Sequence, residues 1–397
     1  MFFFPTRSQI LWGQVWGLAS VQGAITLAWI IYGAYLPKLL LELGLPLSMG
    51  LKLLVIESAL AVLMEPVMGG LSDRSYKWVG SRFPFVAIGI VLSSALFILI
   101  PVVVIFGSPT EVFQWLLIGV LVLWSLAMTI FRSPAIAMLG KYATPKELPL
   151  AVSVVTLVGG FTAAFRPIAN SFLLNNFPPM AIFALGSFIL LGAGATLRSV
   201  QMPDVPSFPE NAEPHRRSLL IPLMLISITG TVIGGGTRFL MDVLGKLIKL
   251  QAGAENVSLI MVGVGIALAL LALPAGKIAT KYGNQLVLLL SLGVTGVGLL
   301  LMGLVPNLLW FAALLVIPAF SAIVNSVIPW ILNLVPSDKS GLGIGSYFGG
   351  FSAAMAIFGL VFPDTGGISP LMSSFYGTIA FGLAAISVKI ATSDSSF

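Results

Sequence analysis

Long apolar stretches alternate with short polar joints along the whole chain. A helix that crosses a membrane needs about 20 mainly apolar residues, and twelve stretches have this length. Their approximate extents are 12–36, 48–71, 83–106, 113–138, 149–174, 178–198, 218–245, 257–279, 285–304, 308–334, 342–362 and 369–390. Proline, glycine, asparagine and aspartate, which favour turns, stand at the joints. The pattern predicts an all-α membrane protein with twelve transmembrane helices.

The longest polar stretch lies in the middle of the chain, at 201–217, and contains four prolines. It offers too little apolar surface to bury, so we expect a flexible cytoplasmic linker there. The linker divides the twelve stretches into six and six. We therefore expect one six-helix bundle over 1–200 and a second over 218–397. Two related halves of this kind are found in many transporter folds.

The composition agrees with a bilayer as the solvent. Mean hydropathy is +1.05 and only 9% of the residues are charged, against about 25% in soluble proteins. The net charge of +6 does not indicate a nucleic-acid partner, because lysine and arginine lie in short loops rather than on one face. The chain has no cysteine, which excludes disulfides and thiolate metal sites. Since no nucleophile–base pair, metal cluster or phosphate-binding loop is evident, we expect neither a cofactor nor an enzymatic activity.

The distribution of basic residues predicts the orientation of the chain. If the N-terminus is cytoplasmic, the loops on that side hold Arg74, Lys77, Arg82, Lys141, Lys146, Arg198, Arg216, Arg217, Lys277, Lys281 and Lys339. The loops on the other side hold mainly Lys38, Lys52, Lys246 and Lys249. Cytoplasmic loops are enriched in basic residues, so we expect both termini in the cytoplasm and the chain in a bacterial inner membrane. The two lysines that end the seventh stretch are the one conflict.

A short motif recurs at the same place in both halves. The second stretch ends in Gly-Gly-Leu-Ser-Asp-Arg over 69–74, and the eighth ends in Gly-Lys-Ile-Ala-Thr-Lys over 276–281. Each begins with glycine and ends, after three further residues, in a polar and then a basic residue. Their matching positions indicate an internal duplication.

The segment 65–84 carries a family resemblance. Its Gly-x-x-x-Asp-Arg pattern resembles the cytoplasmic signature of the major facilitator superfamily. Gly80 follows seven residues after Asp73, and an acidic residue with a proline stands just upstream. These features make the segment similar to the glycoside–pentoside–hexuronide cation symporters, to sucrose carriers and to bacteriochlorophyll-delivery proteins. The resemblance implies the fold of that superfamily, with two pseudo-symmetric six-helix bundles.

The loop after the second stretch also has a physical role of its own. Asp73 stands at a helix end, where it can accept hydrogen bonds from a neighbouring helix N-terminus or pair with a basic residue. Arg132, near the end of the fourth stretch, is the candidate partner. Such a contact would hold one access state and break in the other; the alternative is a loop that is merely solvated. The candidate switch residues are Gly69, Asp73, Arg74, Gly80, Arg82 and Arg132.

Glu65 lies inside an apolar stretch, where a charge costs about 2.5–3.5 kcal/mol. By resemblance, Glu65-Pro66 occupies the position of a cation-binding carboxylate in the sugar symporters, which implies a proton or sodium site. Their second carboxylate lies one turn earlier, where this chain has Ala61, and the next acid is Glu57. One carboxylate that exchanges a proton therefore fits better than sodium coordination by two. The alternative is a hydrogen-bonded glutamate at a helix–helix contact.

Other charges inside apolar stretches also need partners. Arg166 lies deep in the fifth stretch, where Glu57 or an anionic substrate group can neutralise it. Arg238 and Asp242, spaced i, i+4 at the outer end of the seventh stretch, are expected to pair and to form an outer gate. The glycines at 234–236 either break this helix, as in gating helices, or allow tight packing.

Uncharged polar residues at mid-depth are few. By resemblance, the first, fourth, seventh and tenth helices would line a substrate cavity. Gln22 and Asn325, in opposite halves, are candidates for hydrogen bonds to the substrate, and Trp330 is a candidate for stacking on a sugar ring. Each has a structural alternative, namely a polar contact between helices for the amides and an interfacial position for the tryptophan.

Three functions remain open from the sequence. The first is a secondary active transporter that moves a small solute, with a sugar or glycoside as candidate, by alternating access coupled to a proton or sodium gradient. The second is a pigment-delivery or photosynthetic assembly protein of the bacteriochlorophyll-delivery type, which the sparse polar lining keeps open. The third is a proton-driven exporter of hydrophobic compounds. In each we expect a monomer in the lipid bilayer that binds a small molecule and no nucleic acid.

Overall fold

The computed structural model describes residues 10–201, 219–362 and 367–393, and within them it contains helices and no strand. The first half consists of α1 (Trp12–Glu42), α2 (Ser48–Val79), α3 (Phe83–Phe106), α4 (Glu111–Ala137), α5 (Leu139–Tyr142), α6 (Leu148–Ala164), α7 (Arg166–Asn176) and α8 (Pro179–Val200). The second half consists of α9 (Leu220–Ala252), α10 (Val257–Tyr282), α11 (Asn284–Leu304), α12 (Leu309–Leu334), α13 (Ser340–Val361) and α14 (Pro370–Ser393). Short 3-10 turns, η1 (Ala254–Asn256), η2 (Pro306–Leu308) and η3 (Ser337–Lys339), precede α10, α12 and α13. The expected linker lies outside the described residues except for Gln201.

Each of the twelve predicted stretches corresponds to helix. Within the described residues, ten helices are long and apolar enough to cross a membrane, and the consecutive pair α6 and α7 is an eleventh if the two helices together form one span. The remaining stretch is α2, which has 32 residues. Large apolar side chains cover the outer surface, for example Leu259, Leu314 and Trp115, each more than two-thirds exposed. Such a surface is typical of a protein that lipid surrounds.

The fifth stretch, 149–174, was expected as one continuous helix and is instead bent by 54° between α6 and α7. Pro167 explains the break. It has no N–H to donate within a continuing helix and its ring clashes with the preceding turn, but it is well accommodated at the start of a new one. The bend places Arg166 at the first position of α7.

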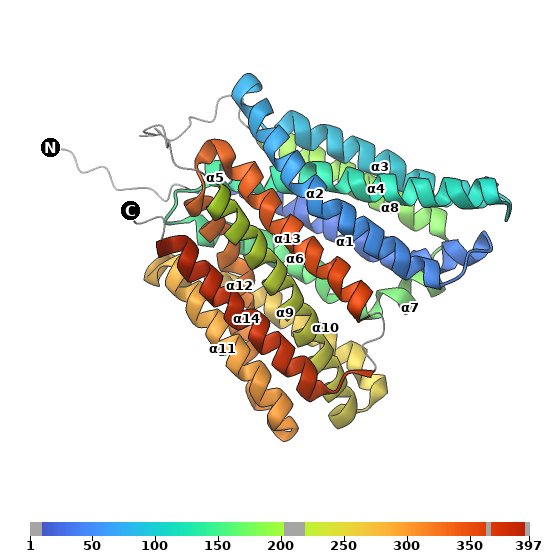
Figure 1. Cartoon of the computed structure of the whole chain (residues 1–397). Coiled ribbons are helices and arrows are strands. Elements are labelled where there is room, and N and C mark those ends of the chain that lie inside the picture. Colours follow the sequence, from blue (N-terminus) through green and yellow to red (C-terminus); the bar gives the residue numbers. More distant parts are fainter. Residues whose placement is uncertain (1–9, 202–218, 363–366, 394–397) are drawn as a thin grey trace.

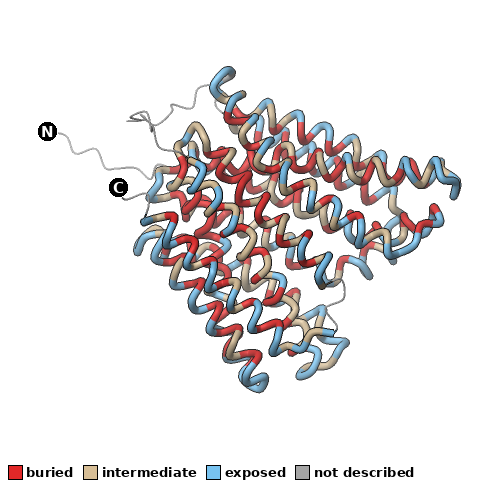
Figure 2. The backbone as a smooth tube through the Cα atoms, viewed as in Figure 1, coloured by how far each residue is buried: buried red, intermediate tan, exposed pale blue. Residues whose placement is uncertain are grey.

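The helices form two bundles, as expected. α1–α4 and α6–α8 pack together as one bundle, and α9–α14 pack together as the other (Figure 1). Buried residues run through the middle of each bundle and along the contact between them (Figure 2).

Two helix pairs make the most extensive contacts between the bundles, α2 with α13 and α6 with α10; we call these the α2–α13 seam and the α6–α10 seam. Glycines let the backbones approach closely in both. In the α2–α13 seam, a Cβ atom on Gly341 would lie 2.5 Å from the carbonyl oxygen of Gly69. In the α6–α10 seam, a Cβ on Gly276 would lie 2.8 Å from the carbonyl oxygen of Pro149.

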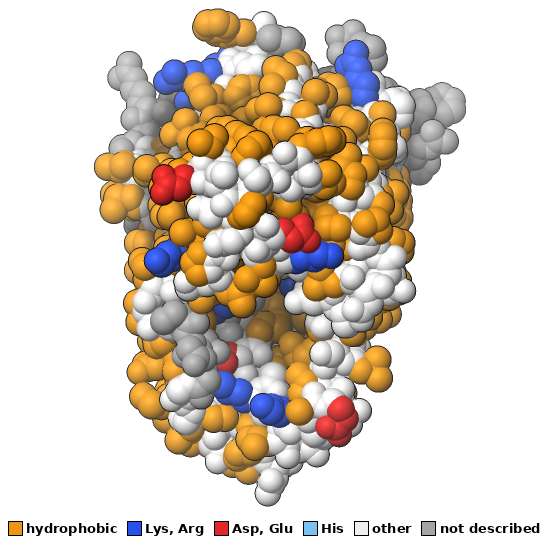
Figure 3. Space-filling model, turned by 90° about the vertical axis from the view of Figure 1, so that its right-hand side faces the viewer, with side chains coloured by type: hydrophobic (Ala, Val, Ile, Leu, Met, Phe, Trp, Pro, Cys, Tyr) orange, Lys and Arg blue, Asp and Glu red, His pale blue; other side chains and the backbone are white. Residues whose placement is uncertain are grey.

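The bundles converge at one end of the molecule and diverge at the other (Figure 1). The closed end is where α2 ends at Val79 and α13 begins at Ser340, and the open end is where α2 begins and α13 ends. A view onto the open end shows a hollow between the two halves, with acidic and basic side chains around it (Figure 3). Buried polar groups also lie between the bundles.

Candidate functional site

A cavity of about 320 Å³ lies between the bundles. Among the described residues, its wall comes from α1, α2, α4, α7 and α13. The polar and charged members include Gln22, Thr26, Glu57, Glu65, Arg132 and Arg166, and the apolar members include Trp29, Met128, Phe348, Phe351 and Met355. The first and fourth helices line the cavity as expected, whereas the seventh and tenth stretches, α9 and α12, contribute no side chain to this wall.

Glu65 is fully buried at the cavity wall and is held from α4. Its Oε1 lies 2.6 Å from Nη2 of Arg132, and the hydroxyl of Ser133 donates a hydrogen bond to Oε2. The guanidinium of Arg132 also lies over the ring of Phe348, 4.3 Å from its centroid. Arg132 therefore neutralises the buried acid, as such a carboxylate requires. The predicted pairing of Arg132 with Asp73 is wrong, because Arg132 points into the cavity.

Glu57 lies two turns earlier on the same helix and is also buried. The hydroxyl of Tyr32 donates to its Oε1 at 2.5 Å, while Oε2 accepts no hydrogen bond within the described part of the chain. No ion pair joins Glu57 to Arg166 there, so that candidate pairing is not formed. The two carboxylates thus differ: Glu65 faces a guanidinium, whereas Glu57 faces a phenol.

An aromatic cluster fixes the phenol of Tyr32. The ring of Trp124 is 4.6 Å from that of Tyr32, and Trp29 meets Tyr32 edge-on at 5.6 Å. Phe97 stacks on Trp124 at 5.0 Å. Tyr32 is one of the few uncharged polar residues inside the apolar stretches, and its residue type alone does not distinguish it from the others. A periodic signal did exist, since Trp29 and Tyr32 are one helical turn apart.

Arg166 begins α7 and lines the cavity, where it is exposed. It has no hydrogen bond or ion pair within residues 10–201, 219–362 and 367–393. Gln22 lines the same cavity from α1, packed against Gly159. These are the two predicted cavity residues that the structure places there.

Asn325 and Trp330 lie elsewhere. The buried amide of Asn325 donates to the carbonyl oxygen of Pro149 at 3.1 Å and so connects α12 with α6 across the bundles. Trp330 is buried near the end of α12, beside a separate pocket that Asn284 and Asn333 also line. Asn325 therefore makes a polar contact between helices, which was the structural alternative to substrate binding.

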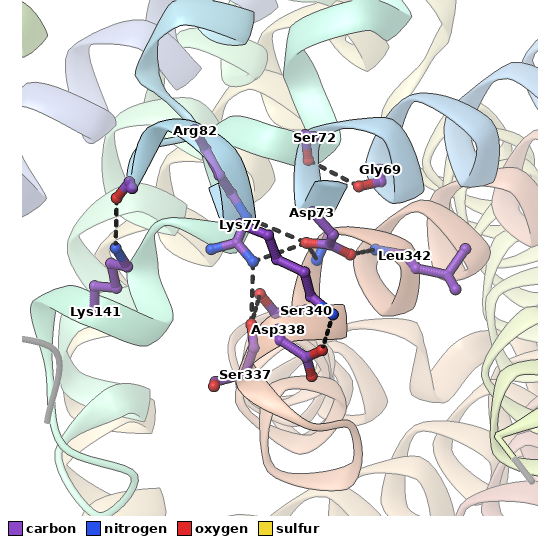
Figure 4. Close-up of polar contacts among 12 residues, drawn as sticks. Gly69, Ser72, Asp73, Lys77, Arg82, Lys141, Ser337, Asp338, Ser340 and Leu342 are labelled. Carbon is purple, nitrogen blue, oxygen red and sulfur yellow. Dashed lines mark hydrogen bonds and ion pairs between the residues drawn. The ribbon is translucent and has the colours of Figure 1, made fainter. Parts of the chain in front are cut away.

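At the closed end, Asp73 joins the two bundles (Figure 4). Its carboxylate accepts two hydrogen bonds from Arg82, at 2.7 and 3.2 Å. It also accepts the backbone N–H groups of Gly341 at 2.9 Å and Leu342 at 2.8 Å, in the first turn of α13. Arg82 in turn donates to the carbonyl oxygen of Ser337 at 3.0 Å. We call these five residues the Asp73 cluster.

The Asp73 cluster satisfies a helix end that its own sequence leaves open. The residue that precedes α13, Lys339, provides no side-chain cap, and the first N–H groups of a helix have no partner within it. A carboxylate at this position also meets the positive end of the helix dipole. Asp73 thus contacts both a helix N-terminus and a basic residue, as predicted, and the basic residue is Arg82.

Two other switch candidates, Arg74 and Gly80, lie at the same end of α2 as this cluster. Gly80 ends α2 in the left-handed conformation, with φ of 74°, which glycine adopts without strain. Arg74 is exposed. Lys77 pairs with Asp338 at 2.9 Å on the surface, and this hydrogen bond raises the pKa of Lys77, which keeps its charge at neutral pH. The second copy of the motif has Thr280 in place of the aspartate. The hydroxyl of Thr280 donates a hydrogen bond to the carbonyl oxygen of Gly276 in its own helix.

Replacing Asp73 with asparagine should loosen the closed end. The amide oxygen can still accept an N–H of α13, but the charge-assisted bonds with Arg82 are lost, and such bonds contribute about 1.5–3 kcal/mol each. The chain has no cysteine, so a single Ser153→Cys reporter in the buried α6–α10 seam can measure exposure. We expect its thiol-labelling rate to rise about tenfold or more. Asp338→Asn is the matched control, because an exposed ion pair contributes little; an equal rise there would contradict this role of Asp73.

The predicted ion pair between Arg238 and Asp242 is wrong, because Asp242 has another partner. Asp242 pairs with Lys246 at 2.7 Å and accepts a hydrogen bond from Ser373 at 2.7 Å. The guanidinium of Arg238 lies instead over the ring of Phe358, 4.8 Å from its centroid. Both pairings are spaced i, i+4, but an acid placed before the base is the more favourable order.

The three glycines at 234–236 do not break α9, which is continuous through them. A Cβ on Gly234 would lie 3.0 Å from Ala354, and one on Gly236 would lie 3.0 Å from the ring of Phe381. Tight packing within the second bundle, the alternative predicted from sequence, is therefore the role of Gly234 and Gly236, whereas a Cβ on Gly235 would meet no atom within 4 Å.

Comparison with known proteins agrees with this fold. The sequence profile of the Major Facilitator Superfamily matches residues 18–251, more than half of the chain. Among curated proteins, none matches the sequence.

Several solved transporter structures are similar over nearly the whole chain. A bacterial homologue of the iron transporter ferroportin, in an outward-facing state, is 14% identical with a TM-score of 0.74 over 96% of this chain and 99% of its own. The proton:xylose symporter XylE is 12% identical with a TM-score of 0.72, over 96% of this chain and 94% of its own. The human organic anion transporter MFSD10 is 12% identical with a TM-score of 0.68, over 96% and 100%. At these identities the likeness shows the fold.

Proposed function

Because this chain belongs to the Major Facilitator Superfamily and is a secondary transporter, we propose that it moves a small solute by alternating access and couples this movement to a proton carried by Glu57. The observation that carries the proposal is the contrast between the two buried carboxylates of the cavity. Glu65 is ion-paired with Arg132, whereas Glu57 is held by the Tyr32 hydroxyl.

The contrast assigns different roles to the two acids. Burial of an ionised carboxylate without a cation is costly, so Glu57 is stable as an acid while its side chain is buried and releases its proton when a conformational change exposes it to water. The ion pair keeps Glu65 charged and fixes Arg132 against Phe348. Protonation of Glu57 would thus alter the charge of the cavity, which is how a proton gradient can bias substrate binding.

The seams and the Asp73 cluster support alternating access. They close the end at which Asp73 meets α13, while the opposite end is hollowed between the two halves (Figure 3). With the orientation expected from the basic loops, this conformation faces outward. Transport to the other side requires the cluster to break and the diverging helices to come together.

The size of the cavity favours a small solute over a pigment. Ligand pockets usually measure about 300–1,000 Å³, and this cavity of about 320 Å³ is at the lower limit. A purified protein that is coloured would support the pigment-delivery alternative. A sugar agrees with the resemblance of the segment 65–84 to sugar symporters.

Replacing Glu57 with glutamine should abolish proton coupling, because an amide keeps the shape of the acid but does not exchange a proton at neutral pH. The measurement is acidification of proteoliposomes that contain a pH dye, after external addition of solutes with an imposed proton gradient. We expect the solute-dependent proton flux to fall to the level of protein-free vesicles. Glu42→Gln, at an exposed position outside the cavity, is the control. Proton flux that survives Glu57→Gln would overturn the assignment to Glu57.

A further inference from the structure

The cavity contains one guanidinium that the coupling scheme does not use. Arg132 and Glu65 neutralise one another. With Glu57 protonated, the remaining charge on the cavity wall is that of Arg166. The cavity then carries a net positive charge, and the group that balances it has to come from outside the chain.

The surroundings of Arg166 do not supply that group. The described residues offer Arg166 no ion pair, and a second cation, Arg238 of α9, acts on it through its charge. Arg238 itself lies over Phe358. An arginine inside a membrane protein is costly without an acceptor, and its exposure to the cavity leaves its donors free. A guanidinium with free donors is well suited to a carboxylate, which it can hold through two parallel hydrogen bonds.

Apolar and aromatic side chains form another part of the wall. Trp29, Phe351 and Met355 face the same cavity, and the ring of Trp29 is fixed by its contact with Trp124 at 4.8 Å. Flat rings beside a cationic end suit a ligand with a charged group and a compact carbon body. One unpaired arginine balances one negative charge, which favours a carboxylate over a doubly charged phosphate.

We propose that the transported solute is a small organic monoanion whose carboxylate is bound by Arg166 and whose body lies against Trp29 and Phe351. This inference rests on the proposed function and names its substrate class. One proton on Glu57 and one carboxylate on Arg166 would enter together, so a transport cycle would move no net charge. Loss of the anion would leave the Arg166 charge in the cavity, which disfavours closure around an empty site.

The test uses the purified full-length protein and matched pairs of probes that differ in charge. The pairs are benzoate with benzamide, phenylacetate with phenylacetamide, and galacturonate with galactose. Binding is measured as the rise in thermal unfolding temperature with probe concentration. At least one carboxylate should stabilise the protein while its neutral partner does not. Arg166→Gln should weaken that binding about 10- to 100-fold, and Arg166→Lys should retain part of it because the charge is kept.

The controls separate this inference from the proposal on which it rests. Lys249→Gln, at an exposed position outside the cavity, should leave the binding of the carboxylate unchanged. Stabilisation by the neutral members alone, stabilisation by no carboxylate of the panel, or equal binding by Arg166→Gln would each overturn the inference. Carboxylate binding that persists while wild-type protein shows no proton flux would instead overturn only the coupling role of Glu57.

Discussion

Replacing Arg132 with glutamine should abolish transport and lower the free energy of unfolding by about 3 kcal/mol, the lower part of the range for breaking a buried ion pair. The physical reason is that Glu65 is completely buried and would lose the guanidinium that neutralises it. We take the lower part of the range because the Arg132 side chain is 23% exposed, so water can replace part of the contact. Thermal unfolding in detergent and solute uptake into proteoliposomes measure the two effects.

The double variant Glu65→Gln/Arg132→Gln distinguishes an ion pair from simple packing. Removing both charges leaves no uncompensated ion, so stability should return toward that of the wild-type protein while transport stays lost. Arg198→Gln, at an exposed position on α8, controls for removal of any arginine. If the double variant were no more stable than Arg132→Gln, the ion pair would not be the source of the loss.

Replacing Gly69 with alanine should prevent the closed end from forming and thereby stop transport. A Cβ at this position would overlap the carbonyl oxygen of Gly341 across the α2–α13 seam. That atom belongs to the backbone and cannot rotate away, so the added methyl group should destabilise the closed conformation by about 1–3 kcal/mol. The population of the opposite conformation should then rise about 5- to 150-fold. Labelling of the Ser153→Cys reporter would measure this rise.

The neighbouring residue is a matched control. A Cβ on Gly70 would lie 3.6 Å from a side-chain atom of Leu342, an ordinary contact. Gly70→Ala makes the same chemical change one position along the same helix and should leave both labelling and uptake near wild-type values. Equal effects of the two alanines would show that helix propensity, and not the seam, is responsible.

The twelve helices could be predicted because a bilayer imposes a minimum apolar length, which is visible in a single sequence. The bend between α6 and α7 could not, since a proline is compatible with a kink, a break or a new helix start. Helix order and bundle membership follow from the repeat. The rotation of each helix about its axis does not, and this rotation decides which side chains meet.

The candidate site shows the same limit. Glu65, Glu57, Gln22 and Arg166 were identified because a charge or amide inside an apolar stretch is unusual, and all four line the cavity. Their partners were not, because Arg132 is near a helix end by sequence yet faces Glu65. Asn325, like Gln22, is an amide inside an apolar stretch, but it makes a hydrogen bond between two helices. Only the packing of α12 on α6 separates the two.

The absence of an acidic residue from the second copy of the repeat has a kinetic consequence. The α2–α13 seam carries the charged Asp73 cluster, whereas Thr280 bonds within α10 and gives the α6–α10 seam no such contact. When the closed end opens, the two seams therefore meet unequal activation barriers. We expect the separation of α13 from Asp73 to meet the higher barrier, so that this single departure sets the speed at which the transporter reorients.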